Sequence, residues 1–181
     1  MSASLAGTRV ATDHGPISKQ LFRQVMGRFA TGVTVVTTTG SNQVYGMTAN
    51  AFMAGSLEPM LGVISINRTA QMHERLRHAG HFGVSFLSEW QQHLSAHFAG
   101  QRLDVGPEFT YRGATPILTR AVAAVTADIV DTAECGDHTL FVGRITHMET
   151  AVGRPLLFYG GRYGRIDFSN PIEEADPPAF W

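Results

Sequence analysis

The chain has 181 residues, of which 44% are hydrophobic, and this length and apolar content suit one domain with a packed core. Fourteen Lys and Arg residues nearly balance fifteen Asp and Glu residues, so the formal net charge is −1. A chain this close to neutral lacks the basic field that draws a protein to nucleic acid or anionic lipid, and we expect neither partner. Its single cysteine, Cys135, excludes an intrachain disulfide and favours a reducing cytoplasm.

The first residues do not have the pattern of a targeting segment. Residues 1–15 lack a basic stretch followed by an apolar run, and nowhere does the chain reach the roughly 20 apolar residues that a membrane span needs. We therefore expect a soluble cytoplasmic protein without a signal peptide. Residues 1–16 are small and polar without periodicity, and we expect them to form a flexible N-terminal arm.

A single domain is expected over residues 17–166, opening with a helix that Ser18 caps. One apolar stripe at helical spacing predicts this helix. It consists of Leu21, Phe22, Val25, Met26 and Phe29. The β-branched run 33–38 then predicts a strand, and the turn residues 40–42 separate it from a second strand over 44–52.

The rest of the domain contains more strands than helices. Helices are expected over 70–78, with Thr69 as the cap, and over 89–98. Residues 100–116 contain scattered glycine and proline and are expected to form a loop. Further strands are expected over 60–66, 82–87, 122–132, 138–149 and 156–159. The last residues, 167–181, contain four acids and three prolines and indicate an acidic, proline-rich tail.

This order of elements predicts the fold class. The helices do not alternate regularly with the strands, so we expect a mainly β fold with helices (α+β), an antiparallel barrel, rather than a doubly wound parallel sheet. The glycine-rich segment 160–164 is not followed by a helix pattern, so it does not make a Rossmann fingerprint.

Three segments are candidates for chemistry. Residues 46–52 combine small side chains with hydroxyl and amide groups, which would let a flat ring such as a flavin approach the backbone. Residues 65–69 join a strand end to a helix start, where free N–H groups and the helix dipole favour a phosphate. Residues 136–139 form a tight turn that displays His138, which could bind a nicotinamide or stabilise reduced flavin. The alternatives are a strand with a polar solvent face, an ordinary helix start and a solvated histidine.

A metal site and a cysteine nucleophile are both disfavoured. His93 and His97 lie at i and i+4, a spacing that can hold one metal, but no third ligand is near in the sequence. His73 and His78 would lie about 140° apart around a helix. Nothing marks the thiolate of Cys135 as stabilised. We therefore expect no metal.

Taken together, an ordered series of segments resembles the flavin reductase family, the small NAD(P)H-dependent partners of two-component aromatic monooxygenases. The series covers roughly residues 20–166. It comprises 22–24, 29–37, 46–52, 56–59, 82–85, 98–100, 136–143 and 155–159. Residues 72–74 and 82–87 are most similar to the reductases of styrene monooxygenases.

The resemblance implies a split β-barrel, usually a homodimer, with flavin near the subunit interface. Residues 47–50 would line the isoalloxazine and ribityl chain, and Ser65, Asn67 and Thr69 would hold phosphate. His138 would be the catalytic residue, and Tyr163 would help to cover the site. The full set of cofactor-binding residues is Met47, Thr48, Ala49, Asn50, Ser65, Asn67, Thr69, Phe98, Ala99, Asp137, His138 and Tyr163.

By the same resemblance, the chain would reduce a flavin with NADH by hydride transfer from nicotinamide C4 to flavin N5. The reduced flavin, FADH2 or FMNH2, would then diffuse to a partner oxygenase. FAD is favoured slightly over FMN because of the styrene-type similarity. The alternatives are a flavin-binding or flavin-storage protein, a ferric-reductase-type enzyme, and a metal- or haem-binding module on the same barrel.

Overall fold

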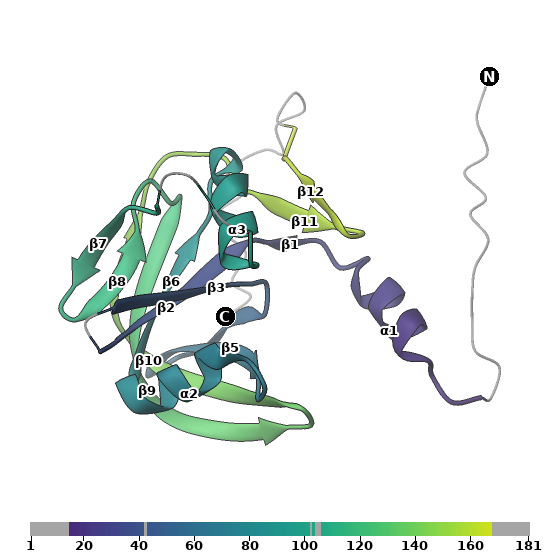
Figure 1. Ribbon diagram of the computed structural model, residues 1–181, viewed down its shortest axis with the longest axis horizontal. Coiled ribbons are helices and arrows are strands. Elements are labelled where there is room, and N and C mark those ends of the chain that lie inside the picture. The colour runs from purple at the N-terminus through teal and green to yellow at the C-terminus, as the bar shows by residue number, and fades with distance from the viewer. Residues whose placement is uncertain (1–14, 42, 102, 104–105, 168–181) are drawn as a thin grey trace.

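The computed structural model describes residues 15–41, 43–101, 103 and 106–167. Its central element is a seven-stranded antiparallel sheet (Figure 1). In spatial order the strands are β3 (Gln43–Ala49), β2 (Thr34–Gly40), β6 (His81–Phe86), β9 (Ala123–Cys135), β10 (His138–Thr150), β5 (Met60–Asn67) and β4 (Phe52–Leu57). The mainly antiparallel β architecture predicted from the sequence is confirmed.

The sheet bends round so that its two edge strands, β3 and β4, follow each other directly in the chain. Only Asn50 and Ala51 separate them, and the Ser65 backbone N–H donates to the Ala51 carbonyl at 3.1 Å. Within the described residues β3 and β4 form no ladder with each other, so hydrogen bonds between strands do not close the barrel. The sheet therefore has the split that a split β-barrel requires.

The core lies inside this curved sheet because alternate residues of its strands are apolar. Ile64 and Ile66 of β5 are fully buried, and so are Phe82 of β6 and Phe141 of β10. Helix α2 (Gln71–Ala79) adds buried Met72 and Leu76 to the same cluster, and it packs against β2, β3, β5 and β6. Helix α2 therefore has a fixed position beside the β3 edge.

Two of the predicted helix starts have different outcomes. Ser18 caps α1 (Lys19–Met26), and its hydroxyl accepts from the Leu21 N–H at 3.1 Å. The prediction that Thr69 caps α2 is wrong, because the N-cap is Ala70, which provides no side-chain bond. The Thr69 hydroxyl instead donates to Asn67 Oδ1 at 2.7 Å, and the Thr69 N–H donates to the same oxygen.

The structure contains short strands that the sequence did not predict. The stretch 44–52 is two strands rather than one, and the predicted loop 100–116 contains the hairpin of β7 (Phe109–Arg112) and β8 (Thr115–Leu118). A three-stranded sheet unites β1 (Thr31–Gly32), β11 (Leu157–Tyr159) and β12 (Arg162–Gly164). The predicted helix 89–98 is a 3-10 turn, η1 (Glu89–Gln91), followed by α3 (Gln92–Phe98).

Helix α1 stands away from the barrel, joined to it through β1 (Figure 1). None of its residues is buried, and four residues of the apolar stripe, Phe22, Val25, Met26 and Phe29, are solvent-exposed in the single chain. None of the helices in the described residues is long and apolar enough to cross a membrane. Most of the predicted N-terminal arm (1–14) and of the predicted tail (168–181) lies outside the described residues.

Candidate functional site

The outer edge of β3 carries the segment expected to face a flavin. Along its inner edge Met47, Thr48 and Ala49 pair with Val36, Val35 and Thr34 of β2. Its outer edge pairs with no strand of the described residues, so backbone N–H and C=O groups there remain available to a ligand. Such an edge provides the mixed donors and acceptors that the rim of an isoalloxazine ring requires.

A glycine lets an aromatic ring come close to this strand. A Cβ at Gly46 would overlap the ring of Phe98, which projects from α3. Phe98 is half-buried and also packs edge-on against Phe109 at 6.4 Å between ring centroids. Ala99, predicted beside it, is the exposed residue that ends α3.

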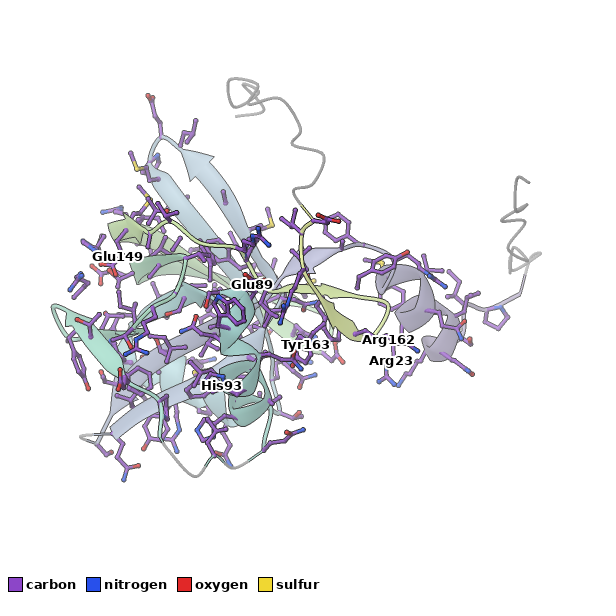
Figure 2. All side chains as sticks on the ribbon, turned by 90° about the horizontal axis from the view of Figure 1, so that it is seen from above. Arg23, Glu89, His93, Glu149, Arg162 and Tyr163 are labelled. Atoms are coloured by element: carbon purple, nitrogen blue, oxygen red, sulfur yellow. The ribbon has the colours of Figure 1, made fainter. Side chains whose placement is uncertain are left out.

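A buried serine connects the two sides of this part of the site. Thr48 donates from Oγ1 to the Ser95 carbonyl at 2.7 Å, and the Ser95 hydroxyl lies 2.9 Å from the Tyr163 hydroxyl. Ser95 has no exposed surface. Figure 2 shows Tyr163, on β12, beside α3. The structure thus brings the predicted residues Thr48, Phe98 and Tyr163 together.

The predicted phosphate residues lie where β5 ends and α2 begins. Asn67 Oδ1 holds Thr69 in a tight local turn, and Ser65 is half-buried two residues earlier on β5. The His73 N–H donates to the Ala70 carbonyl at 3.0 Å, and because Ala70 offers no side-chain cap, the N–H groups of Gln71 and Met72 are left for an anion. The donors present at this position suit a phosphate.

The turn between β9 and β10 lies against the same position. Gly136 adopts a positive φ of 61°, and the Asp137 carbonyl accepts from the Arg68 N–H at 3.0 Å. His138 is the register partner of Asn67. The predicted phosphate residues and the predicted nicotinamide residues are therefore neighbours in one chain.

Asp137 fixes the orientation of the His138 ring. Its Oδ1 lies 2.7 Å from His138 Nδ1, and a carboxylate only accepts, so Nδ1 carries the proton and Nε2 is left for a ligand. The hydrogen bond and the charge of His138 hold the pKa of the exposed Asp137 carboxyl below its usual value. The Asp137 carboxylate thus orients the imidazole ring of His138, and the second ring nitrogen, Nε2, is left to bind a ligand.

The described contacts of these residues form two separate groups. One unites β3, α3 and Tyr163, and the other unites the end of β5, the start of α2 and the turn at 136–138. A cavity of about 790 Å³ lies elsewhere, between α3 and the turns at 119–122 and 151–154, and no predicted flavin residue lines it. In the single chain, no described contact connects the two groups into one enclosed site.

Sequence reasoning missed Ser95, and it placed Gly46 in the candidate segment 46–52 without foreseeing its contact with Phe98. The close contact of Gly46 with Phe98 depends on packing between residues far apart in the chain, and an isolated serine on a short helix gives no signal. Among the described residues no group of three His, Cys, Asp or Glu side chains could hold a metal ion. His97 instead contacts the Gln101 carbonyl through Nδ1 at 3.1 Å.

A family model described as a flavin reductase like domain matches residues 26–167. The chain belongs to this family. The resemblance inferred from the ordered segments is therefore confirmed.

The flavin reductase family includes named relatives and solved structures similar to this chain. An NADH-dependent flavin reductase from a Rhodococcus species is 39% identical, covering 80% of this chain and 85% of the relative. The NADH-dependent flavin reductase StyB of Pseudomonas fluorescens is 37% identical, covering 81% and 89%. The structure of the flavin reductase PheA2 superposes with a TM-score of 0.81 at 41% identity, covering 83% of this chain and 99% of that one.

Proposed function

We propose that this member of the flavin reductase family oxidises NADH and reduces a flavin. The hydride, two electrons with one proton, passes from nicotinamide C4 to flavin N5, so that NADH becomes NAD⁺. One further proton from solvent completes the reduced flavin. The observation that carries the proposal is the unpaired outer edge of β3 at residues 47–49, with the uncapped start of α2 nearby on the same barrel.

The protein's part is to hold two flat rings in contact, because the cofactors supply the redox chemistry. The β3 backbone and Asn50 hold the rim of the isoalloxazine ring, with Phe98, Ala99 and Tyr163 around it. Asn67, Thr69 and the first turn of α2 hold the phosphate, with Ser65 beside them. No side chain needs to act as an acid or base in the hydride step.

His138 is proposed to act at the nicotinamide. The Asp137 carboxylate keeps the proton of His138 on Nδ1, so Nε2 is available to the nicotinamide amide or to the negative charge of reduced flavin. The side chain of His138 is 39% exposed, which leaves it accessible to a bound nucleotide.

The active form is proposed to be a homodimer. Helix α1 presents Phe22, Val25 and Met26, each more than half exposed, and the β4–β5 hairpin presents Met53 and Met60 in the same way. Exposed apolar surface of this kind marks protein interfaces. A second subunit would also complete a site whose two residue groups stay separate in one chain.

The reduced flavin is proposed to leave the enzyme and serve a flavin-dependent monooxygenase. One relative, 34% identical, is named as the reductase component of a 4-nitrophenol monooxygenase, which supports an oxygenase partner. Other relatives are named an FAD reductase and an FMN reductase. FAD is the flavin we favour, with NADH as the donor.

The decisive assay follows the loss of NADH absorbance while free FAD or FMN is titrated into the purified protein. A rate that rises with added flavin and then saturates is expected for a reductase that releases its product. Flavin binding without NADH oxidation would instead identify a binding or storage protein. Flavin that stays bound through turnover would contradict release.

A further inference from the structure

Arg75 of α2 stacks on the ring of Tyr45 of β3. The guanidinium carbon lies 3.2 Å from the centroid of the ring. The ion pairs of the described residues do not include Arg75, and its neighbour Glu74 contacts His73 instead. The stack therefore holds a planar cation rigidly, without a carboxylate to neutralise it.

This stack separates two hollows along the groove between α2 and the β2–β3 hairpin. The smaller, about 160 Å³, reaches Met47 on the proposed flavin edge. The larger, about 770 Å³, extends past Arg75 to Ser41 and His78. Gln71 and Arg75 line both hollows, so these two side chains lie between them.

Arg75 also lies on the path that a ligand would follow from the start of α2. Side chains on a helix point back toward its N-terminus, and Gln71 and Arg75, four residues apart, share one face. Gln71, in the first turn of α2, and Arg75 accordingly line the same two hollows. A second phosphate attached to one bound at that turn would meet Arg75 next.

We propose that Arg75, held on Tyr45, binds the adenylyl phosphate of FAD and that the larger hollow takes the adenosine, so that the enzyme selects FAD over FMN. The inference rests on the proposed function, since it begins from a flavin phosphate at the start of α2. FMN ends at its first phosphate and cannot use either feature. A planar guanidinium suits both a phosphate and the face of a nucleobase.

The walls of the larger hollow suit an adenosine. Its volume falls within the range of small-molecule sites, about 300–1,000 Å³. Ser41 and Gln71 provide a hydroxyl and an amide group for ribose and base, and the Glu74 carboxylate also lines the hollow. His81 is already satisfied, because its Nδ1 contacts the Ala79 carbonyl at 3.0 Å and its Nε2 contacts Thr39 Oγ1 at 3.1 Å, so it forms a fixed wall.

NADH carries the same adenosine diphosphate group as FAD, and the experiment has to separate the two sources. Titration calorimetry measures the Kd of FAD and of FMN for the wild type, Arg75→Gln and Arg75→Lys. Arg77→Gln is the matched control, because Arg77 is an exposed residue of the same helix. Steady-state assays with FMN as acceptor then give the KM for NADH in the same proteins.

Wild-type protein is expected to bind FAD more tightly than FMN. Arg75→Gln should weaken FAD about tenfold or more, in line with the loss of a charge-assisted hydrogen bond, and leave FMN within about twofold. Arg75→Lys keeps the charge without the planar stack and should fall between, and Arg77→Gln should change neither flavin. Equal weakening of FAD and FMN in Arg75→Gln, or no weakening, would overturn the proposal.

If Arg75→Gln raises the KM for NADH with FMN as acceptor, the hollow belongs to NADH, and this result would also overturn the proposal. Failure of the proposed function looks different. In that case the wild type oxidises no NADH with either flavin, while the effect of Arg75→Gln on the FAD Kd is still measurable.

Discussion

His73 Nε2 lies 2.9 Å from Thr139 Oγ1, and both side chains are buried between α2 and β10. Thr139 follows His138 directly, so this bond joins the helix start proposed to hold phosphate to the strand that begins with the nicotinamide residue. The ring of His73 also packs edge-on against Phe141, with centroids 5.4 Å apart. The start of α2 and the turn at 136–138 are therefore held at a fixed spacing by contacts inside the barrel.

Replacing Thr139 by valine should test this bond. The shape is kept, but His73 is left buried with one ring nitrogen lacking its partner, so the free energy of unfolding should fall by about 1–3 kcal/mol. Urea unfolding measures it. Thr150→Val, at an exposed position of the same strand, should stay within about 0.5 kcal/mol. Equal losses in the free energy of unfolding for both variants would show that the His73–Thr139 hydrogen bond has no special role.

His138→Ala should raise the KM for NADH or slow flavin reduction, because the nitrogen oriented toward the nicotinamide is lost. An effect of about tenfold corresponds to one good hydrogen bond. Asp137→Asn, which keeps the shape of the orienting residue without its charge, should have a smaller effect in the same direction. Stopped-flow reduction with NADH separates binding from the chemical step. Unchanged kinetics in His138→Ala would exclude it from the mechanism.

Gly46→Ala should disturb the flavin edge without touching a polar group. The added methyl meets the ring of Phe98, and overpacking of this kind costs about 1–3 kcal/mol in the free energy of unfolding. Flavin affinity should fall with it. The double variant Gly46→Ala/Phe98→Leu should recover stability relative to Gly46→Ala, whereas additive losses would mean that the two residues do not share the space.

Glu149 should give the stability of the β7–β10 contact a pH dependence. Its Oε2 lies 3.1 Å from His147 Nε2 and 3.0 Å from Arg112 Nε, and these partners, His147 first, hold its pKa below the ordinary 4.5. A carboxyl whose pKa is lowered in the folded state stabilises the fold fully above its unfolded-state pKa. This stabilisation is lost as the pH falls through the lowered folded-state pKa.

Wild type should therefore lose more stability than Glu149→Gln between about pH 6 and pH 3, by no more than about 1 kcal/mol because the pair is partly exposed. Chemical unfolding at several pH values measures the difference. Parallel curves for the two proteins would show that the carboxylate contributes nothing to the contact.

Phe22→Glu on α1 should shift the proposed dimer toward monomer and weaken flavin binding at the same time, because the site is proposed to need both subunits. Sedimentation velocity and flavin titration are the paired measurements. Gln24→Glu introduces the same charge at a polar position of the same helix and should alter neither. A Phe22→Glu variant that remains dimeric would direct attention to Met53 and Met60 instead.

Sequence patterns predicted the fold where the signal is local. The β-branched run at 33–38, the Ser18 cap and the Gly136–Asp137 turn all depend on neighbouring residues, and each occurs as predicted. The hairpin β7–β8 escaped because its strands have four residues each and one contains Pro116. Short strands of this kind form because burial supports them, and burial of a segment depends on the rest of the chain.

The candidate site follows the same division. The segments 46–52, 65–69 and 136–139 were found because their residue types are unusual for a strand or turn. The connection from Thr48 through Ser95 to Tyr163, and the stack of Arg75 on Tyr45, join residues far apart in the chain. No spacing rule links such partners, so only the folded arrangement reveals them.

The exposed apolar face of α1 has a consequence for how the protein behaves on dilution. A helix of eight residues, none of them buried, is not stable in water by itself. Under the dimer proposal the packing that stabilises it comes from the second subunit, so its folding becomes part of assembly. Under the dimer proposal, helix content, thermal midpoint and flavin affinity would all fall together as the protein concentration drops below the dissociation constant of the subunits.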